Sequence, residues 1–378
     1  MNGNGIKQCQ HLYRNVRKAV LENKYKWMYK NQDSIKISEK NSTLFITNDN
    51  MGGTRVFEDG YKKNHQNIIV LRRISYGERP DIMYKIENRT RPDILLLKKD
   101  LELLWKSKFT EIIINTLVHY SETYYFLDSI RQYKKDNPNC KLVYMVHDYN
   151  SICVNCNLFI KDHYCNLECK KEKCDLRLAD TKINLNIWRE KWSQLLGVAD
   201  EIRNFSNSSA SILKTVYDFI PKEKITVKPH DISYIEQEKI KLTNTMPFHL
   251  GIVGDCNADI KGRPIVKRLI NDFGNDIRIT LVGSSFIHYR IIRRKVEYTG
   301  GYKRDELKKV LEDKQITCVL FPSLCPETFS YLVSELIIMD IPVLCFNYGA
   351  QAEKIKAYDK GVLLNSNEEL WKYIDQKK

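Results

Sequence analysis

Two glutamates lie eight residues apart in an otherwise mostly apolar stretch, residues 321–350. Glu327 follows an apolar run and two prolines, so it is predicted to lie in a loop between a buried strand and a helix. Glu335 is predicted to lie about two turns into that helix. Eight residues at 100° each bring both positions close to one side of the helix, so both carboxylates are predicted to face one cleft.

The start of this helix is predicted to bind an anion. The first amides of a helix have no partner inside it, and the helix dipole favours negative charge there. A carboxylate is a poor phosphate ligand, but it accepts hydrogen bonds from hydroxyl groups. The predicted ligand therefore carries both phosphates and hydroxyls. The amides in question belong to Phe329, Ser330, Tyr331 and Leu332.

The composition is that of a globular, water-soluble protein. The chain has 378 residues, of which 43% are hydrophobic and 29% charged. Because one core rarely grows beyond roughly 250–300 residues, two domains are expected. No stretch offers the roughly 18 unbroken apolar residues of a membrane span. The N-terminus lacks an apolar signal core, so we expect a cytoplasmic protein with reduced cysteines.

Short apolar runs alternate with helix-length segments, which indicates parallel sheets in α/β domains. The first set falls in residues 41–235, after an N-terminal extension over residues 1–40, and its runs are TLFITND, NIIVLRR, DILLLK, EIIINTL, KLVYMVHD and ADEIRNFS. A polar linker is predicted within residues 231–248. The second set falls in residues 246–378, with the runs HLGIVGD, IRITLVG, TCVLFPS and PVLCFN. Ligands of such doubly wound domains bind at the carboxyl ends of the strands.

The stretch FPSLCPETFSYLVSELIIMDIPVLCFNYGAQAEKI closely resembles the donor-binding motif of family 4 of the retaining glycosyltransferases. The shared features are P-S, P-E-x-F, a second Glu eight residues after the first, P-V, and G-A-x-x-E. The resemblance covers most of the second domain. It implies an α/β protein with the GT-B fold, in which two Rossmann-like doubly wound domains face each other across a cleft.

The resemblance also implies roles for individual residues. Glu335 would hold the ribose hydroxyls of a nucleotide-sugar, Glu327 would contact the sugar ring near the reacting carbon, and the amides after Phe329 would hold the diphosphate. Lys261 matches the lysine that neutralises the leaving diphosphate. Gly283 matches a glycine turn whose backbone approaches the nucleotide.

Two positions depart from the family pattern. Asp255 stands where the family usually has an arginine six positions before the lysine, and Ser330 stands where it prefers glycine. Arg263 and Lys267 are candidates to replace the missing arginine, and each is equally well explained as a solvated helix residue.

In the first domain, Gly52 and Gly53 follow the first predicted strand and allow a tight turn near a ligand. The resemblance places this turn over the donor phosphates and the acceptor. His147 ends a buried strand and resembles the family histidine that faces the reacting sugar, where an imidazole can bond a hydroxyl. His119 also ends a strand and is a second candidate, for the acceptor. An ordinary turn and structural histidines are the alternative interpretations.

Five cysteines fall within 22 residues: Cys153, Cys156, Cys165, Cys169 and Cys174. Their spacing is compatible with a structural zinc site of thiolate ligands, which would order a loop of low apolar content. Unpaired thiols explain the spacing equally well, and disulfides are the third alternative. The resemblance implies that catalysis itself needs no cofactor.

A net charge of +14 is compatible with nucleic acid, an anionic membrane surface or a phosphorylated substrate as the partner, or with a solvated lysine-rich surface. No nucleic-acid-binding module is evident, so nucleic acid is not predicted. The predicted partners are a nucleotide-sugar donor and an acceptor glycan, with a lipid-linked acceptor and peripheral contact with the inner face of the membrane as hypotheses.

The sequence thus predicts a glycosyltransferase that transfers a hexosyl or related sugar to an acceptor hydroxyl with retention, in bacterial surface polysaccharide or glycoconjugate synthesis. Two alternatives stay open. One is a GT-B scaffold that has lost activity and serves as a binding or stabilising subunit, suggested by Asp255 and a short C-terminal segment. The other is a nucleic-acid-binding protein, suggested by charge alone.

Overall fold

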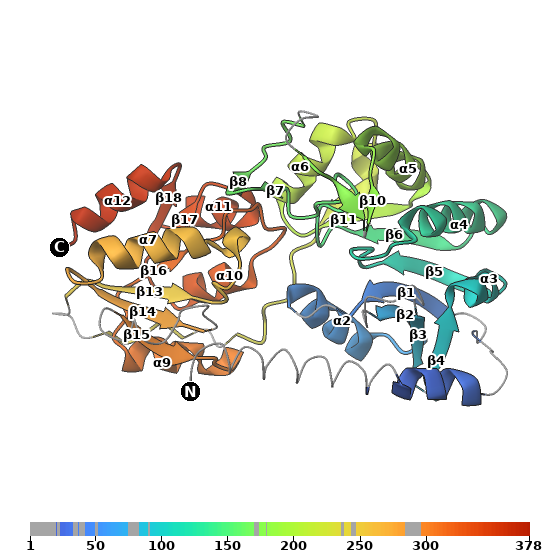
Figure 1. Ribbon diagram of the computed structural model, residues 1–378, viewed down its shortest axis with the longest axis horizontal. Helices are drawn as coiled ribbons and strands as arrows, with labels where there is room; N and C mark the ends of the chain where they lie inside the picture. The colour runs from blue at the N-terminus through green and yellow to red at the C-terminus, as the bar shows by residue number, and fades with distance from the viewer. Residues whose placement is uncertain are drawn as a thin grey trace. The chain divides into compact units, whose positions relative to one another are not determined.

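The computed structural model divides into two compact units, which we describe separately (Figure 1). Unit 1 comprises residues 1–154, 176–203 and 219–226, and unit 2 comprises residues 155–175, 204–218 and 227–378. The structure describes residues 20, 23–32, 37, 42–49, 52–74, 83–89, 91–169, 174–178, 180–235, 238–242, 247–283 and 296–378. Most of the predicted N-terminal extension lies outside these residues, although residues 23–31 are helical.

Unit 1 is built on an eight-stranded sheet with the order β12-β11-β6-β5-β1-β2-β3-β4. Its strands are β1 (Ser42–Asn48), β2 (Ile68–Ile74), β3 (Met83–Asn88), β4 (Ile94–Leu97), β5 (Phe109–Ile114), β6 (Lys141–Met145), β11 (Glu201–Asn204) and β12 (Ile225–Val227). Its helices are α2 (Gly53–Asn64), α3 (Leu101–Trp105), α4 (Thr123–Asp136) and α5 (Leu185–Val198), and β9 (Arg177–Leu178) and β10 (Thr181–Lys182) form a small separate hairpin.

The six predicted strands of unit 1 are present, and the sheet contains two more, β3 and β12. β1 pairs in parallel with β2 and β5, β5 with β6, and β6 with β11. Of the two added strands, β3 is antiparallel to both β2 and β4. Its polar sequence MYKIEN does not read as a buried strand, and the short connection to β4 permits an antiparallel pair only.

Unit 2 contains a six-stranded parallel sheet with the order β15-β14-β13-β16-β17-β18. The strands are β13 (His249–Val253), β14 (Arg278–Val282), β15 (Glu297–Gly300), β16 (Cys318–Phe321), β17 (Val343–Phe346) and β18 (Gly361–Leu364). The helices are α6 (Asn207–Val216), α7 (Arg263–Phe273), α9 (Leu307–Asp313), α10 (Tyr331–Ile338), α11 (Gly349–Lys356) and α12 (Asn367–Asp375). In chain order the strands read 3-2-1-4-5-6, the order of doubly wound dinucleotide-binding domains.

Alternate side chains of the buried strands of unit 2 belong to two separate hydrophobic cores, one on each face of the sheet. Leu250, Leu320 and Leu344 pack with α7 and α12 on one face of the sheet. Val319 and Val343 pack with α9, α10 and α11 on the other face. Because both faces are covered, the strands are apolar at nearly every position, as the sequence predicts.

Three segments that the sequence assigns to the N-terminal domain belong to unit 2: residues 155–175, 204–218 and 227–235. The first, residues 155–175, carries the short hairpin β7 (Phe159–Ile160) and β8 (His163–Tyr164), and Phe159 packs against the core of unit 2. The second, residues 204–218, carries α6. The backbone amide of Ser208 in the first turn of α6 donates to Glu353 Oε2 over 2.6 Å. Contacts distant in sequence therefore set this boundary.

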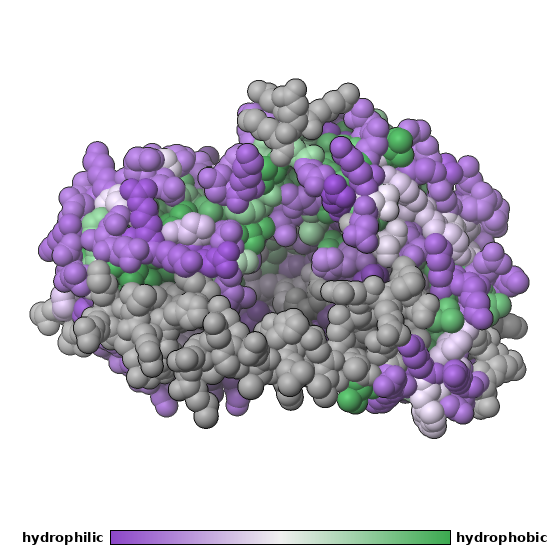
Figure 2. Space-filling model, in the orientation of Figure 1, coloured by the Kyte–Doolittle hydropathy of each residue, from purple (hydrophilic) through white to green (hydrophobic). Residues whose placement is uncertain are grey.

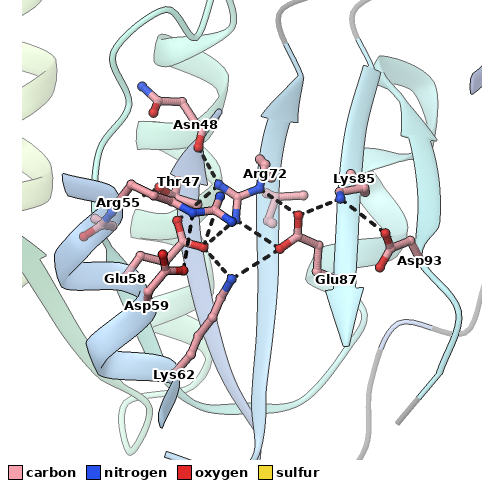
Figure 3. Close-up of polar contacts among 12 residues, drawn as sticks. Thr47, Asn48, Arg55, Glu58, Asp59, Lys62, Arg72, Lys85, Glu87 and Asp93 are labelled. Carbon is pink, nitrogen blue, oxygen red and sulfur yellow. Dashed lines mark hydrogen bonds and ion pairs between the residues drawn. The ribbon is translucent and has the colours of Figure 1, made fainter. Parts of the chain in front are cut away.

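A buried ion cluster holds α2 against the sheet of unit 1 (Figure 3). The Arg72 guanidinium lies between the carboxylates of Glu58, on α2, and Glu87, on β3, and it also donates to the carbonyl of Asn48 over 2.6 Å. The Arg72 and Glu58 side chains are only 5% and 1% exposed. Lys62, one turn after Glu58 on α2, joins the cluster by pairing with both carboxylates. The cluster thereby fixes the helix that begins at the predicted glycine turn.

Hydrogen bonds decide the charge state of this cluster. Burial opposes the charge of Arg72, but Glu87 and Glu58 outweigh it and raise the pKa of the guanidinium. Burial likewise opposes the charge of Glu87, and its bonds to Arg72 and Lys85 lower its pKa. Each charge is therefore stable only while its partners are present.

Among the described helices, none combines the length and apolar character that crossing a membrane requires. Figure 2 shows hydrophilic side chains over much of the described surface on the visible face, with smaller apolar areas between them.

Replacing Arg72 by methionine should reduce the free energy of unfolding of unit 1 by about 3 kcal/mol, because it leaves Glu58 buried without its main partner. Urea unfolding measures this loss. The matched control is Arg131→Met on α4, whose pairing with Asp128 is more exposed and which should change the stability by less than about 0.5 kcal/mol. Equal, small losses in both variants would contradict a stabilising role for the cluster.

Candidate ligand site

The strand order of unit 2 reverses between β13 and β16, which are neighbours in the sheet. From β13 the chain moves outward through β14 and β15, and from β16 it moves outward in the other direction. In sheets of this kind the loops leaving the two strands at the reversal separate and leave a crevice for a ligand. The predicted residues Lys261 and Glu327 follow β13 and β16 respectively, so both lie in the loops of this reversal point.

Lys261 and Glu327 form an ion pair in which Lys261 Nζ lies 2.7 Å from Glu327 Oε1. The glutamate raises the pKa of Lys261. Burial opposes the charge of Glu327, but Lys261, helped by the Ser323 hydroxyl, lowers the pKa of its carboxyl. The two side chains are 42% and 18% exposed, so the charged pair stays accessible to a ligand.

Close backbone approaches fix the loops on both sides of this pair. Gly262, next to Lys261, has φ 82°, and a Cβ there would lie 2.3 Å from the carbonyl oxygen of Pro322. The predicted Gly283 has φ 117° and directly follows β14, and a Cβ there would lie 2.6 Å from the carbonyl oxygen of Gly254. Only glycine fits these contacts. Ser284 and Ser285, which follow in the predicted turn, lie outside the described residues.

The loop that carries Glu327 is oriented by Gln351, a buried residue of α11. The Gln351 amide accepts from the backbone N–H of Glu327 over 3.0 Å and donates to the carbonyl of Cys325 over 2.7 Å. The backbone N–H of Ala350 also donates to the Glu327 carbonyl, over 2.9 Å. These bonds satisfy the backbone of a buried loop and fix the direction of the Glu327 side chain.

Helix α10 begins two residues later than the sequence predicts. Its N-cap is Ser330, which has φ 62° and ψ 86°, and its first residue is Tyr331. The Ser334 amide bonds back to the Ser330 carbonyl over 3.4 Å, so the amides before it lie ahead of the helical ladder. The predicted anion-binding amides therefore lie at and just before the start of α10. Glu335 lies little more than one turn into α10, not two.

Glu335 is buried and pairs with Arg304, a residue that the sequence analysis missed. Arg304 Nε lies 2.9 Å from Glu335 Oε1, and the Tyr234 hydroxyl donates to the same oxygen over 3.3 Å. The Arg304 guanidinium also lies over the rings of Tyr331 and Tyr234, at 5.0 and 5.4 Å from their centroids. Burial raises the pKa of Glu335 despite the attraction of Arg304. The arrangement provides a carboxylate and a cation within a cluster of aromatic rings.

Lys354, on α11, is a second residue that the sequence analysis missed. Its ammonium donates to the Ser330 carbonyl over 3.1 Å and to the Ser334 hydroxyl over 2.5 Å. It also lies 3.4 Å from the centroid of the Phe329 ring. Burial lowers the pKa of Lys354 to about 7, against the attraction of Glu327 and Glu353. No pattern in the sequence marks this lysine, because its partners come from a different helix.

Arg263 and Asp255 are engaged within their own loop. The Arg263 guanidinium donates to Asp259 over 2.6 Å and to the carbonyl of Asn257 over 3.1 Å. Asp255 accepts from the backbone and the side-chain amide of Asn257, over 2.9 and 2.6 Å. The two residues shape the turn that leads to Lys261.

The predicted residues of unit 1 lie at the ends of its strands and at one helix. Gly52, with φ 106°, is the N-cap of α2, and Gly53 is its first residue. His147 follows β6, with its ring 4.8 Å from that of Phe57 on α2. His119 has φ 67° and an exposed side chain. Partial desolvation of its ring, and then the charge of Arg73, lower its pKa.

Asp148, next to His147, was missed by the sequence analysis. It accepts from the Thr116 hydroxyl over 2.7 Å and from the Asn150 amide over 2.9 Å. Burial raises the pKa of its carboxyl to about 6. The segment after β6 thus carries an imidazole and a carboxyl in adjacent positions, and Thr116, after β5, holds the carboxyl.

The ten cysteines that the structure describes are free thiols. Cys165 lies near Cys169 and Cys174; burial first, and then their charges, raise the pKa of its thiol. In the described part of the chain, no three His, Cys, Asp or Glu side chains are arranged to hold a metal ion. A structural zinc site bound by Cys153, Cys156 and these three thiols therefore stays a prediction from spacing.

No protein-family model matches the chain, and no curated protein matches it. Several solved structures are similar in fold. HepE of Anabaena in complex with UDP is 15% identical, with a TM-score of 0.53 over 89% of both chains. Sucrose-phosphate synthase of Thermosynechococcus elongatus is 12% identical, with a TM-score of 0.56 over 89% of both chains. A glycosyltransferase of Rickettsia africae is 13% identical, with a TM-score of 0.54 over 89% of this chain and 88% of that one.

These similarities concern the fold, because the identities are low. The similar structures are GT-B glycosyltransferases, and the chain shares their mixed α/β architecture with parallel sheets. The predicted fold class is thereby confirmed.

Replacing Glu327 by glutamine should lower the pKa of Lys261 by about one unit or more, because the carboxylate is the main cause of its raised value and the remaining burial disfavours the charge. Titration of lysine side chains by NMR measures the change. The control is Glu353→Gln, which removes a carboxylate near Lys354 and should leave the pKa of Lys261 in place. An unchanged Lys261 pKa in Glu327→Gln would show that the ion pair is not formed in solution.

Proposed function

We propose that the chain is a glycosyltransferase that moves a sugar from a nucleotide-sugar donor to an acceptor hydroxyl with retention of configuration. The observation that carries the proposal is the Lys261–Glu327 ion pair at the reversal point of the unit 2 sheet, with the start of α10 directly after the Glu327 loop. The position suits a ligand with a diphosphate and a sugar. The fold shared with glycosyltransferases supports the same conclusion.

The donor would lie along the carboxyl ends of β13, β14 and β16. Its diphosphate would bind the amides of Phe329, Ser330, Tyr331 and Leu332, with Lys261 as the neutralising cation. Glu335 would accept the ribose hydroxyls. The similar HepE structure contains UDP, so a uridine diphosphate sugar is the first donor to test.

The reaction breaks the bond between the anomeric carbon of the sugar and the diphosphate oxygen, and that oxygen keeps the electron pair. Lys261 and the α10 amides would stabilise the negative charge that develops on the diphosphate. The acceptor oxygen then bonds to the anomeric carbon on the same face, and its proton passes to the departing phosphate oxygen. In this mechanism the protein acts by positioning and electrostatics and forms no covalent intermediate.

Glu327 has two roles in this proposal. One carboxylate oxygen binds Lys261 and sets its position and charge. The other oxygen would accept a hydrogen bond from a hydroxyl of the transferred sugar. Because the carboxyl stays ionised at neutral pH, it can accept that hydrogen bond throughout the reaction.

Unit 1 is proposed to bind the acceptor and the sugar through the ends of its strands. His147 would bond a sugar hydroxyl, His119 would contact the acceptor, and Gly52 and Gly53 would let the backbone approach the ligand. Asp148 adds a carboxyl whose raised pKa suits a partner for a hydroxyl group.

Membership of family 4, the role in surface polysaccharide or glycoconjugate synthesis, the lipid-linked acceptor and the location at the inner face of the membrane rest on the sequence resemblance. We propose them on that ground. No catalytic cofactor is required by the mechanism, and structural zinc is proposed from the cysteine spacing.

One observation favours a second function. The Glu335 carboxylate is buried against Arg304 and Tyr234, which compete with ribose hydroxyls for it. In a scaffold that has lost activity and serves as a binding or stabilising subunit, Arg304 and Tyr234 would stay bound to the Glu335 carboxylate without loss of function. Nucleotide binding distinguishes the two functions.

Calorimetric titration of a panel of nucleoside diphosphates and their sugars should find one base that binds. Glu335→Ala should weaken that binding by tenfold to hundredfold, roughly the value of hydrogen bonds to a charged group. Glu369→Ala, which removes an exposed glutamate of α12, should bind as the wild type does. Absence of binding at millimolar ligand would overturn the donor site and favour the scaffold.

Replacing Lys261 by methionine should slow donor hydrolysis, in which water takes the place of the acceptor, by about a hundredfold or more. Release of nucleoside diphosphate measures the rate, and Lys309→Met on the exposed face of α9 is the control. The NMR spectrum of the freshly released sugar should show the anomeric configuration of the donor. A rate like that of the control would contradict the role of Lys261, and an inverted anomer would contradict retention.

A further inference from the structure

The turn before α10 contains a residue in an uncommon conformation. Ser330 has φ 62° and ψ 86°, in the left-handed region, where side chains other than glycine are strained. It is buried, at 6% exposure. Such a conformation persists only when the surrounding structure holds it in place.

Lys354 contacts this turn in three places. Its ammonium bonds the Ser330 carbonyl and the Ser334 hydroxyl and lies over the face of the Phe329 ring. The contacts therefore reach the residue before Ser330, Ser330 itself and the first turn of α10. The Ser334 amide also reaches the Ser330 carbonyl, but at the long distance of 3.4 Å. The lysine is thus the closer of these two donors to that carbonyl.

The helix that carries Lys354 is itself anchored next to it. Glu353 accepts from the backbone amide of Ser208 over 2.6 Å and from the Asn207 side chain over 2.9 Å, at the start of α6. Gln351, three residues before Lys354, binds the Glu327 loop. One helix, α11, therefore holds both the acid loop and the α10 turn.

The Phe329 ring is also held from other directions. The His230 ring meets it edge to face at 4.7 Å between centroids, and the Tyr331 ring meets it at 5.0 Å. His230 in turn stacks between Phe205 and Tyr331. The ammonium of Lys354 thus lies against a ring whose position is fixed, which is a favourable geometry for a cation and an aromatic face.

We propose that Lys354 is a positioning residue of the donor site: it holds Ser330 in its left-handed conformation, so that the amides at the start of α10 point toward the donor diphosphate. The inference rests on the proposed function, because it assigns those amides to the diphosphate. It also explains how the chain tolerates serine at a position where glycine would adopt the turn without strain.

The charge of Lys354 is sensitive to its surroundings. Burial lowers its pKa to about 7, and the carboxylates of Glu327 and Glu353 oppose that shift. The titratable ring of His230 also lies near it, and its own pKa is lowered to about 3, first by burial and then by Lys354. Retaining a lysine where burial disfavours its charge supports a specific role for its hydrogen bonds, since an apolar side chain would fill the space at lower cost.

The test is a double-mutant cycle on UDP affinity, measured by calorimetry with the full chain. Lys354→Met, which keeps most of the length of the side chain and removes its donors, should weaken binding by about tenfold. Ser330→Gly keeps the backbone amide that is assigned to the diphosphate, and it is the reference for the double variant. The double variant should bind within about threefold of Ser330→Gly, because glycine adopts the turn without help from the lysine. Lys356→Met, exposed on the same helix, is the control and should have no effect.

Two results would overturn the inference. Wild-type affinity in Lys354→Met would show that the turn keeps its conformation without the lysine. Failure of Ser330→Gly to restore binding in the double variant would show that the lysine acts through its charge or its packing, and not through the turn. Lys354→Gln, which retains a hydrogen-bond donor and should lose less affinity than Lys354→Met, replaces the methionine variant if that one does not fold.

The failure of the proposed function is separable from the failure of this inference. If the wild type binds neither UDP nor any other nucleoside diphosphate, the proposed donor site is wrong. The coupling between Lys354 and Ser330 can still be read in the urea unfolding of the same four proteins. Additive effects on stability would then remove the structural basis of the inference as well.

Discussion

The ion pair between Lys261 and Glu327 is the contact on which the account of unit 2 depends. It joins the loops that leave β13 and β16, the two strands between which the sheet reverses its order. Without the glutamate, the loop after β13 would carry an isolated cation against a partly buried surface, and without the lysine the glutamate would be protonated or displaced. The pair therefore explains why a chain with a net charge of +14 places an acid at this position.

Each unit uses charged groups to fix a loop near its first strand. In unit 1, Arg72 binds the carbonyl of Asn48 at the end of β1 and the carboxylate of Glu58 on α2, and so secures the helix after the glycine turn. In unit 2, Lys261 in the loop after β13 binds Glu327. The first arrangement is nearly sealed from solvent, whereas the second is partly exposed. The difference agrees with a structural role for Arg72 and with the ligand-binding role proposed for Lys261.

Most of the fold could be predicted from the sequence, because the strands of a doubly wound sheet are buried on both faces and read as continuous apolar runs. Residues 44–46 and 318–321 are examples. β3 could not be predicted, since its charged side chains belong to an edge region of the sheet and its pairing is set by its neighbours. The boundary between the units could not be predicted either, because Phe159 and Ser208 join unit 2 through contacts far away in the sequence.

The placement of Glu327 in a loop and of Glu335 on the following helix was predictable, because the spacing of these residues is fixed by one loop and one helix. Arg304 and Lys354 were not, because each reaches its partner from a different helix or turn. Their positions depend on how α10 packs beside α11 and beside the loop after β15. Local sequence patterns carry no information about such packing.

The measurement that tests the central claim most directly is a crystal structure of the chain with UDP. The account predicts the diphosphate within hydrogen-bonding distance of Lys261 Nζ and of the amides at the start of α10, with the ribose hydroxyls at Glu335. A nucleotide bound elsewhere on unit 2, with the Lys261–Glu327 pair and the α10 amides making no contact with it, would contradict the account.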